Sequence, residues 1–110
     1  MEYLELSPEA LMWISYMFAP DEREQVCKLL TEQCGNNLPF LPRIDQTGAD
    51  RLRFAVLKLS DGDFGKLEKA VTLAKRDWRD LLVAAGFAND LQAHKEWVPE
   101  RRWRPFGSDE

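Results

Sequence analysis

The candidates for nucleophilic or metal chemistry in this chain are two cysteines, Cys27 and Cys34, and one histidine, His94. The cysteines are seven residues apart in a segment expected to be helical, so they stand roughly 10 Å apart, too far for a disulfide. A metal site would need further ligands besides these three groups. We therefore predict neither a metal nor a cofactor, and we interpret the cysteines as small, partly buried side chains.

His94 is the only imidazole, and it stands in the polar stretch Gln92-Ala-His-Lys-Glu96. A catalytic partner has to be close only in space, so Asp77, Asp80 or a cysteine could serve His94. The ordinary interpretation of a histidine in such a polar segment is a surface side chain. We expect the protein not to be an enzyme, and a small enzyme built on His94 is the alternative function.

Two groups of carboxylates could also suggest a site. Ser60-Asp-Gly-Asp63 matches only the first residues of a calcium loop and lacks the later ligands. We interpret it as a helix start, with Ser60 as N-cap and Asp63 at the capping-box position. The run Lys75–Asp80 is interpreted as a solvated helix face, and the alternative is that Asp77 or Asp80 binds a buried arginine.

The C-terminal tail, residues 100–110, combines guanidinium groups with aromatic rings, which are the residue types enriched at binding hot spots. Such a tail could dock an acidic partner, or hold nucleic acid weakly through stacking and charge. The alternative is that it folds back onto the acidic helices of its own chain. The candidate partner-binding residues are Arg101, Arg102, Trp103, Arg104 and Phe106.

Composition limits the classes of protein to consider. The chain has 110 residues, 45% of them hydrophobic, and a net charge of −4, which suits one globular domain over 1–99 followed by the tail. The acidity argues against nucleic acid and against anionic membrane as partners, and no apolar run approaches the roughly 20 residues of a membrane span. An acidic N-terminus and only two cysteines favour the cytoplasm.

The strongest structural signal is a periodic apolar stripe in the C-terminal half. Its members recur at spacings of three and four, as on one face of a helix. Gly86 suits a left-handed C-terminal position, followed by Phe87. We therefore predict one long helix over about 60–86. The stripe consists of Phe64, Leu67, Val71, Ala74, Trp78, Leu81 and Ala85.

Two further helices are expected near the N-terminus. Ser7 and Pro8 mark the start of the first helix, and Pro20 both stops it and opens the second. The short connection favours an antiparallel hairpin. Because the first helix is apolar nearly all round, we expect it to be central or to meet a partner. The second is expected to close at Gly35.

The remaining segments are less regular. Residues 36–48, with two prolines, predict a loop across the core. Residues 51–58 fit either a helix face or a half-buried strand, and we favour a helix over about 49–58 because no second strand exists to pair with. A short helix is expected between Asn89 and Pro99. The fold class is thus all-α, a compact bundle of four to five helices, with α+β as the alternative.

Two segments, Phe54-Ala-Val-Leu-Lys-Leu-Ser-Asp-Gly-Asp63 and Asp77-Trp-Arg-Asp-Leu-Leu-Val-Ala-Ala-Gly-Phe87, resemble parts of short uncharacterised bacterial proteins. The similarity covers about residues 50–97. It implies a bacterial, cytosolic origin, and it assigns no site because no named family or activity goes with it.

These observations together predict a small protein-interaction protein. Its small size, acidity and four tryptophans, without an assembled catalytic set, are typical of proteins that act by binding. A toxin-neutralising or regulatory protein is one concrete form, by analogy only. The sequence leaves open whether the apolar helices pair within one chain or across a homodimer axis.

Overall fold

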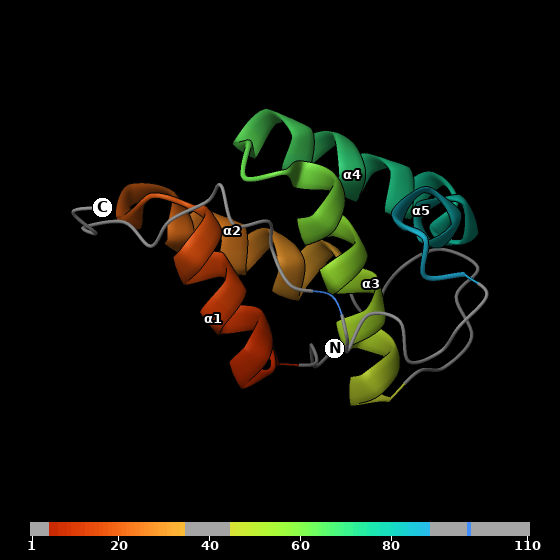
Figure 1. Ribbon diagram of the computed structural model, residues 1–110, viewed down its shortest axis with the longest axis horizontal. Coiled ribbons are helices and arrows are strands. Elements are labelled where there is room, and N and C mark those ends of the chain that lie inside the picture. The colour runs from red at the N-terminus through yellow and green to blue at the C-terminus, as the bar shows by residue number, and fades with distance from the viewer. Residues whose placement is uncertain (1–4, 35–44, 89–96, 98–110) are drawn as a thin grey trace.

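The computed structural model describes residues 5–34, 45–88 and 97, and within them the chain is all-α (Figure 1). The predicted helical bundle is confirmed, and the alternative strand over 51–58 is wrong, because those residues lie inside a helix. The helices are α1 (Pro8–Met17), α2 (Pro20–Gln33), α3 (Gln46–Ser60), α4 (Phe64–Arg76) and α5 (Trp78–Ala85).

The N-terminal hairpin of α1 and α2 forms as its sequence predicts. The Ser7 hydroxyl accepts a hydrogen bond from the backbone N–H of Ala10 at 3.1 Å, and Pro8 occupies the first turn. The α1 helix ends at Met17, and α2 begins at Pro20 with acidic residues in its first turn. Gly35, the predicted end of α2, lies outside the described residues.

Helix α3 is longer than the predicted segment 49–58 and lies at the centre of the bundle (Figure 1). Its N-cap is Asp45, whose carboxylate accepts a hydrogen bond from the N–H of Gly48 at 2.9 Å. Every residue from Leu52 to Leu57 is buried, because α3 packs against α1, α4 and α5 at once. A helix enclosed on several sides has apolar residues around much of its circumference, which explains why its sequence also resembled a strand.

The single long helix predicted over 60–86 is wrong, because the chain breaks it twice. Ser60 is the last residue of α3 rather than an N-cap, and the turn after it uses Asp61 and Gly62 with positive φ angles of 52° and 79°. Asp63 then caps α4, accepting from the N–H of Lys66 at 3.1 Å. Asp77, with φ −159° and ψ 96°, separates α4 from α5.

The apolar stripe nevertheless lies in the core. Five of its members are buried, and Phe64 and Trp78 pack against the core from its edge. The stripe keeps its phase across Asp77 because α4 and α5 both pack on α3. Gly86 has the predicted left-handed conformation, with φ 81°, and Phe87 is buried behind it.

Candidate functional site

The two thiols are not activated for chemistry. Burial raises the pKa of Cys34 to about 12, and it also raises the pKa of Cys27. A thiol with a raised pKa holds almost no nucleophilic thiolate near neutral pH. Both cysteines are free, and no cluster of histidine, cysteine and acidic residues that could hold a metal occurs within 5–34, 45–88 and 97.

The carboxylates singled out by their spacing act in the fold. Asp63 caps α4, and the Asp77 carboxylate accepts from the N–H groups of Arg79 and Asp80 at 3.0 and 3.4 Å, capping α5. A buried arginine does exist, as one interpretation of the charge run required. It is Arg53, however, and it donates to backbone carbonyls, while the Asp77 carboxylate accepts from the backbone of α5.

Two sets of predicted functional residues lie outside the described part of the chain. His94 falls in 89–96, and Arg101, Arg102, Trp103, Arg104 and Phe106 fall in 98–110. The enzymatic alternative and the tail as a binding segment therefore stay predictions. The short helix predicted between Asn89 and Pro99 and most of the loop over 36–48 also lie outside the described residues.

Basic side chains on α3 bind the C-terminal ends of other helices. The guanidinium of Arg53 is fully buried and donates to three backbone carbonyls, those of Leu30, Cys34 and Glu5, at 3.1, 3.0 and 2.8 Å. Arg53 thereby stabilises the end of α2, where carbonyls lack helical partners and the helix dipole favours a cation. Burial lowers the pKa of Arg53, yet an arginine stays protonated.

The same arrangement recurs at two other helix ends. Lys58 donates to the carbonyl of Ala85 at 2.7 Å and lies 5.0 Å from the centre of the Phe87 ring, and Arg51 donates to the carbonyl of Phe87. In the hairpin, Arg23 donates to the carbonyl of Phe18 at 3.0 Å. These four cations stabilise the fold, so none of them is a candidate for binding a ligand.

The first candidate surface is the exposed side of α1. Leu11 and Met12 are 45% and 52% exposed, while Ala10, Ile14 and Met17 on the opposite side are buried. We call the exposed, uncharged strip of Pro8, Leu11, Met12 and Ser15 the α1 face. A contiguous apolar patch on a surface helix is typical of a contact site.

An aromatic cluster lies behind the α1 face and fixes the position of α1. The rings of Trp13 and Trp97 meet edge to face with centroids 6.3 Å apart, and Trp97 lies 6.2 Å from Phe54 on α3. Aromatic pairs of this kind add about 1 kcal/mol beyond the area they bury. These contacts pack α1 onto the core through Trp13, on the side away from the α1 face.

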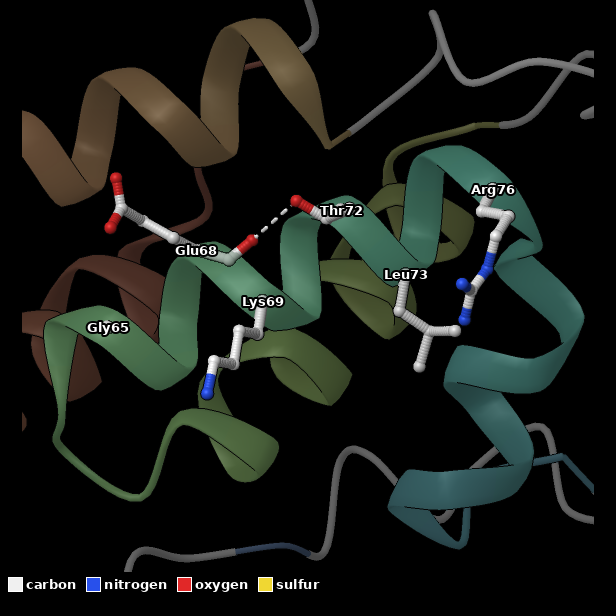
Figure 2. Close-up of a pocket in the computed structure, with 6 residues that line it drawn as sticks. All are labelled: Gly65, Glu68, Lys69, Thr72, Leu73 and Arg76. Atoms are coloured by element: carbon white, nitrogen blue, oxygen red, sulfur yellow. Dashed lines mark hydrogen bonds between the residues drawn. The ribbon is translucent and has the colours of Figure 1, made fainter.

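The second candidate surface is a shallow, open depression of about 450 Å³ on the outer side of α4. Figure 2 shows Lys69, Leu73 and Arg76 extending to the same side of the helix, while the side chain of Glu68 extends away from them. The Thr72 hydroxyl donates to the Glu68 carbonyl at 3.0 Å. We call this depression the α4 groove; it is lined by Gly65, Glu68, Lys69, Thr72, Leu73 and Arg76.

Comparisons with known proteins identify no relative: no family model, no curated protein and no solved structure matches this chain. The resemblance of residues 50–97 to short bacterial proteins therefore stays a prediction. Within the described residues, no helix is both long and apolar enough to cross a bilayer.

The sequence indicated one of these surfaces and missed the other. The first helix is apolar nearly all round, which predicts that it is central or meets a partner. The helix α1 lies at the side of the bundle (Figure 1), and its side chains Leu11 and Met12 are exposed. The α4 groove was missed because neither Lys69 nor Leu73 belongs to the apolar stripe or to the charge run Lys75–Asp80, the two sequence patterns interpreted in this region. The spacing of i, i+4 and i+7 places Lys69, Leu73 and Arg76 on one face and was the available signal.

Proposed function

We propose that this protein is a small protein-interaction domain that binds a basic partner protein through the α1 face. The observation that carries the proposal is the exposure of Leu11 and Met12 on a strip without a charge. Large apolar side chains on a rigid helix, surrounded by polar positions, are the usual centre of a protein contact.

The charge of the hairpin favours a basic partner. Residues 5–34 contain six acidic and only two basic side chains, and one of the two, Arg23, is bound to backbone carbonyls of α1. A negative field around an apolar patch attracts a positive surface and accelerates its association. The same field opposes a homodimer through the α1 face, because two hairpins of net charge −4 would meet.

We place this function in the cytoplasm of a bacterium. The free thiols Cys27 and Cys34 support a reducing compartment, and the bacterial origin rests on the resemblance of residues 50–97. Neutralisation of a basic toxin is one form that the function could take. In that form, co-expression should protect the host from the toxin, and the variant Met12→Lys should lose the protection.

The decisive experiment compares variants of the full chain as bait in host lysate. We expect one stoichiometric basic protein to bind the wild type, to dissociate as salt is raised, and to be lost on Met12→Lys. The matched control is Val83→Lys, because Val83 is 65% exposed on α5 away from the α1 face. A partner that survives Met12→Lys would overturn the proposal, as would a wild-type dimer that this substitution dissociates.

A chain ending at Pro99 separates the α1 face from the tail. If the partner is lost only on this truncation, the binding site consists of the tail residues Arg101 to Phe106, and the α1 face is not the contact. If the truncated chain keeps the partner and Met12→Lys loses it, the α1 face is sufficient.

A further inference from the structure

We propose that the α4 groove binds an acidic segment of a partner protein, with an apolar side chain on Leu73 and carboxylates on Lys69 and Arg76. This surface is distinct from the α1 face and has the opposite preference for charge. The inference therefore stands or fails independently of the proposed function.

The shape of the groove comes from four positions on one side of α4. Gly65 has no side chain and leaves one end open, Leu73 is half-buried and forms an apolar floor, and Lys69 and Arg76 stand on either side of that floor (Figure 2). The two cations are seven residues apart, which corresponds to roughly 10 Å along the helix axis. The groove thus offers a cation, an apolar surface and a second cation in a row.

The cations of the groove differ from most others in the described residues. Arg51, Arg53 and Lys58 bind helix carbonyls, and Lys75 binds the side chain of Gln33. Lys69 and Arg76 have no hydrogen-bond, ion-pair or ring partner within 5–34, 45–88 and 97. An exposed cation without an intramolecular partner can bind an incoming carboxylate without first breaking a contact.

The surroundings favour a protein segment over nucleic acid. Glu68 contributes a carboxylate to the rim of the groove, and the chain as a whole carries a charge of −4, which opposes a polyanion. An acidic segment with an apolar residue fits better, because it uses the Leu73 floor and needs only two carboxylates. Three to four residues of extended chain span roughly 10 Å, the separation of the two cations along α4.

The test is a titration of the ¹⁵N-labelled full chain with a designed peptide, acetyl-DELEDELE-amide, followed by amide chemical shifts. We expect saturable shifts at Gly65 to Arg76, with a dissociation constant at or below about 1 mM. Arg76→Glu should weaken binding about fivefold, because an attraction becomes a repulsion. Lys28→Glu, at an exposed position on α2, should leave the affinity within about twofold and serves as the matched control.

Several outcomes would overturn the inference. These are the absence of shifts in α4, equal effects of Arg76→Glu and Lys28→Glu, or unchanged binding when the peptide leucines are replaced by serine. Tighter binding of a single-stranded oligonucleotide of the same net charge would assign the groove to nucleic acid instead. Self-association that Arg76→Glu abolishes would mean that the acidic hairpin of a second copy is the occupant.

Discussion

The hairpin of α1 and α2 and the unit of α3 to α5 differ in net charge and in the contacts that their basic side chains make. Residues 5–34 carry six acidic and two basic side chains, whereas residues 45–88 carry seven acidic and eight basic ones. In the second unit, three of the cations bind helix ends from α3, and Lys69 and Arg76 face the α4 groove. The hairpin has one such cation of its own, Arg23.

This difference shows that the helix ends of the two units are stabilised in different ways. The unit of α3 to α5 stabilises its own helix ends, since Arg51 and Lys58 bind the end of α5. The hairpin depends on a cation from the other unit, because Arg53 of α3 stabilises the end of α2. Arg53 is therefore a buried polar link between the two units, whereas the contact of Lys75 with Gln33 is exposed, and the hairpin should respond most strongly to the removal of Arg53.

The largest effect is expected from Arg53→Met, which keeps the volume of the side chain and removes its charge. It leaves the carbonyls of Leu30, Cys34 and Glu5 without their guanidinium donor. Because an unsatisfied buried polar group costs about 1–3 kcal/mol, we expect the free energy of unfolding to fall by about 3–5 kcal/mol. Urea denaturation followed by circular dichroism measures the change.

Arg51→Met is the matched control for that measurement. Arg51 binds the carbonyls of Phe87 and Ala88 from a partly exposed position, where water can replace it. Its removal should cost about 1 kcal/mol. Equal losses for the two variants would show that Arg53 is no special link between the hairpin and α3.

The next effect concerns the break between α4 and α5. Asp77→Ala removes the side chain that accepts from the N–H groups of Arg79 and Asp80, so the unfolding free energy should fall by about 1–2 kcal/mol. Asp80→Ala keeps the cap and should cost less. If Asp77→Ala stabilised the chain and raised its helicity, the break between α4 and α5 would be caused by tertiary packing and not by the Asp77 cap.

Asp77 also shows how far the sequence could predict the fold. The stripe from Phe64 to Ala85 correctly gave the buried face, because burial follows helical periodicity. It could not show the break, since α4 and α5 pack on the same helix and keep the same phase. The local signal was present: Lys75 and Arg76 suit a helix end, and Asp77 suits a helix start.

Other features depend on contacts between distant residues, and sequence patterns contain no sign of them. In the alternating pattern of residues 51–56, Arg53 is one of the polar positions, which a strand would expose to solvent. It is buried instead, because carbonyls 19 and 23 residues away accept hydrogen bonds from its guanidinium. Ser60 is a different case, because its contact is local: the hydroxyl donates backward to the carbonyl of Leu57 at 2.6 Å, so this serine closes α3 instead of capping the next helix. The existence of the α1 face could be predicted, because a helix that is apolar nearly all round leaves some apolar side chains exposed unless its neighbours enclose it on every side.

A smaller effect is expected from pH at the junction of the two units. The pKa of Cys34 is about 12 in the folded chain against an ordinary 9.0, so the folded state keeps a proton that the unfolded state loses. The contribution of this thiol to the free energy of unfolding is therefore fully present below pH 9. It is lost as the pH rises toward 12, by about 1 kcal/mol between pH 9 and 10. Cys34→Ala should remove that part of the slope, and an unchanged slope would contradict the buried position of the thiol.

The smallest effect is expected on the α1 face, where the free energy of unfolding should not depend on Met12. Met12→Lys and Val83→Lys both replace an exposed apolar side chain, so each should change the unfolding free energy by less than about 0.5 kcal/mol. Thermal melts of the two variants beside the wild type measure this. A loss above about 1 kcal/mol for Met12→Lys alone would show that Met12 packs within its own chain. Equal, negligible changes would show that Met12 has no role in folding, so that a partner lost on Met12→Lys but kept on Val83→Lys reports on the contact at the α1 face and not on the stability of the chain.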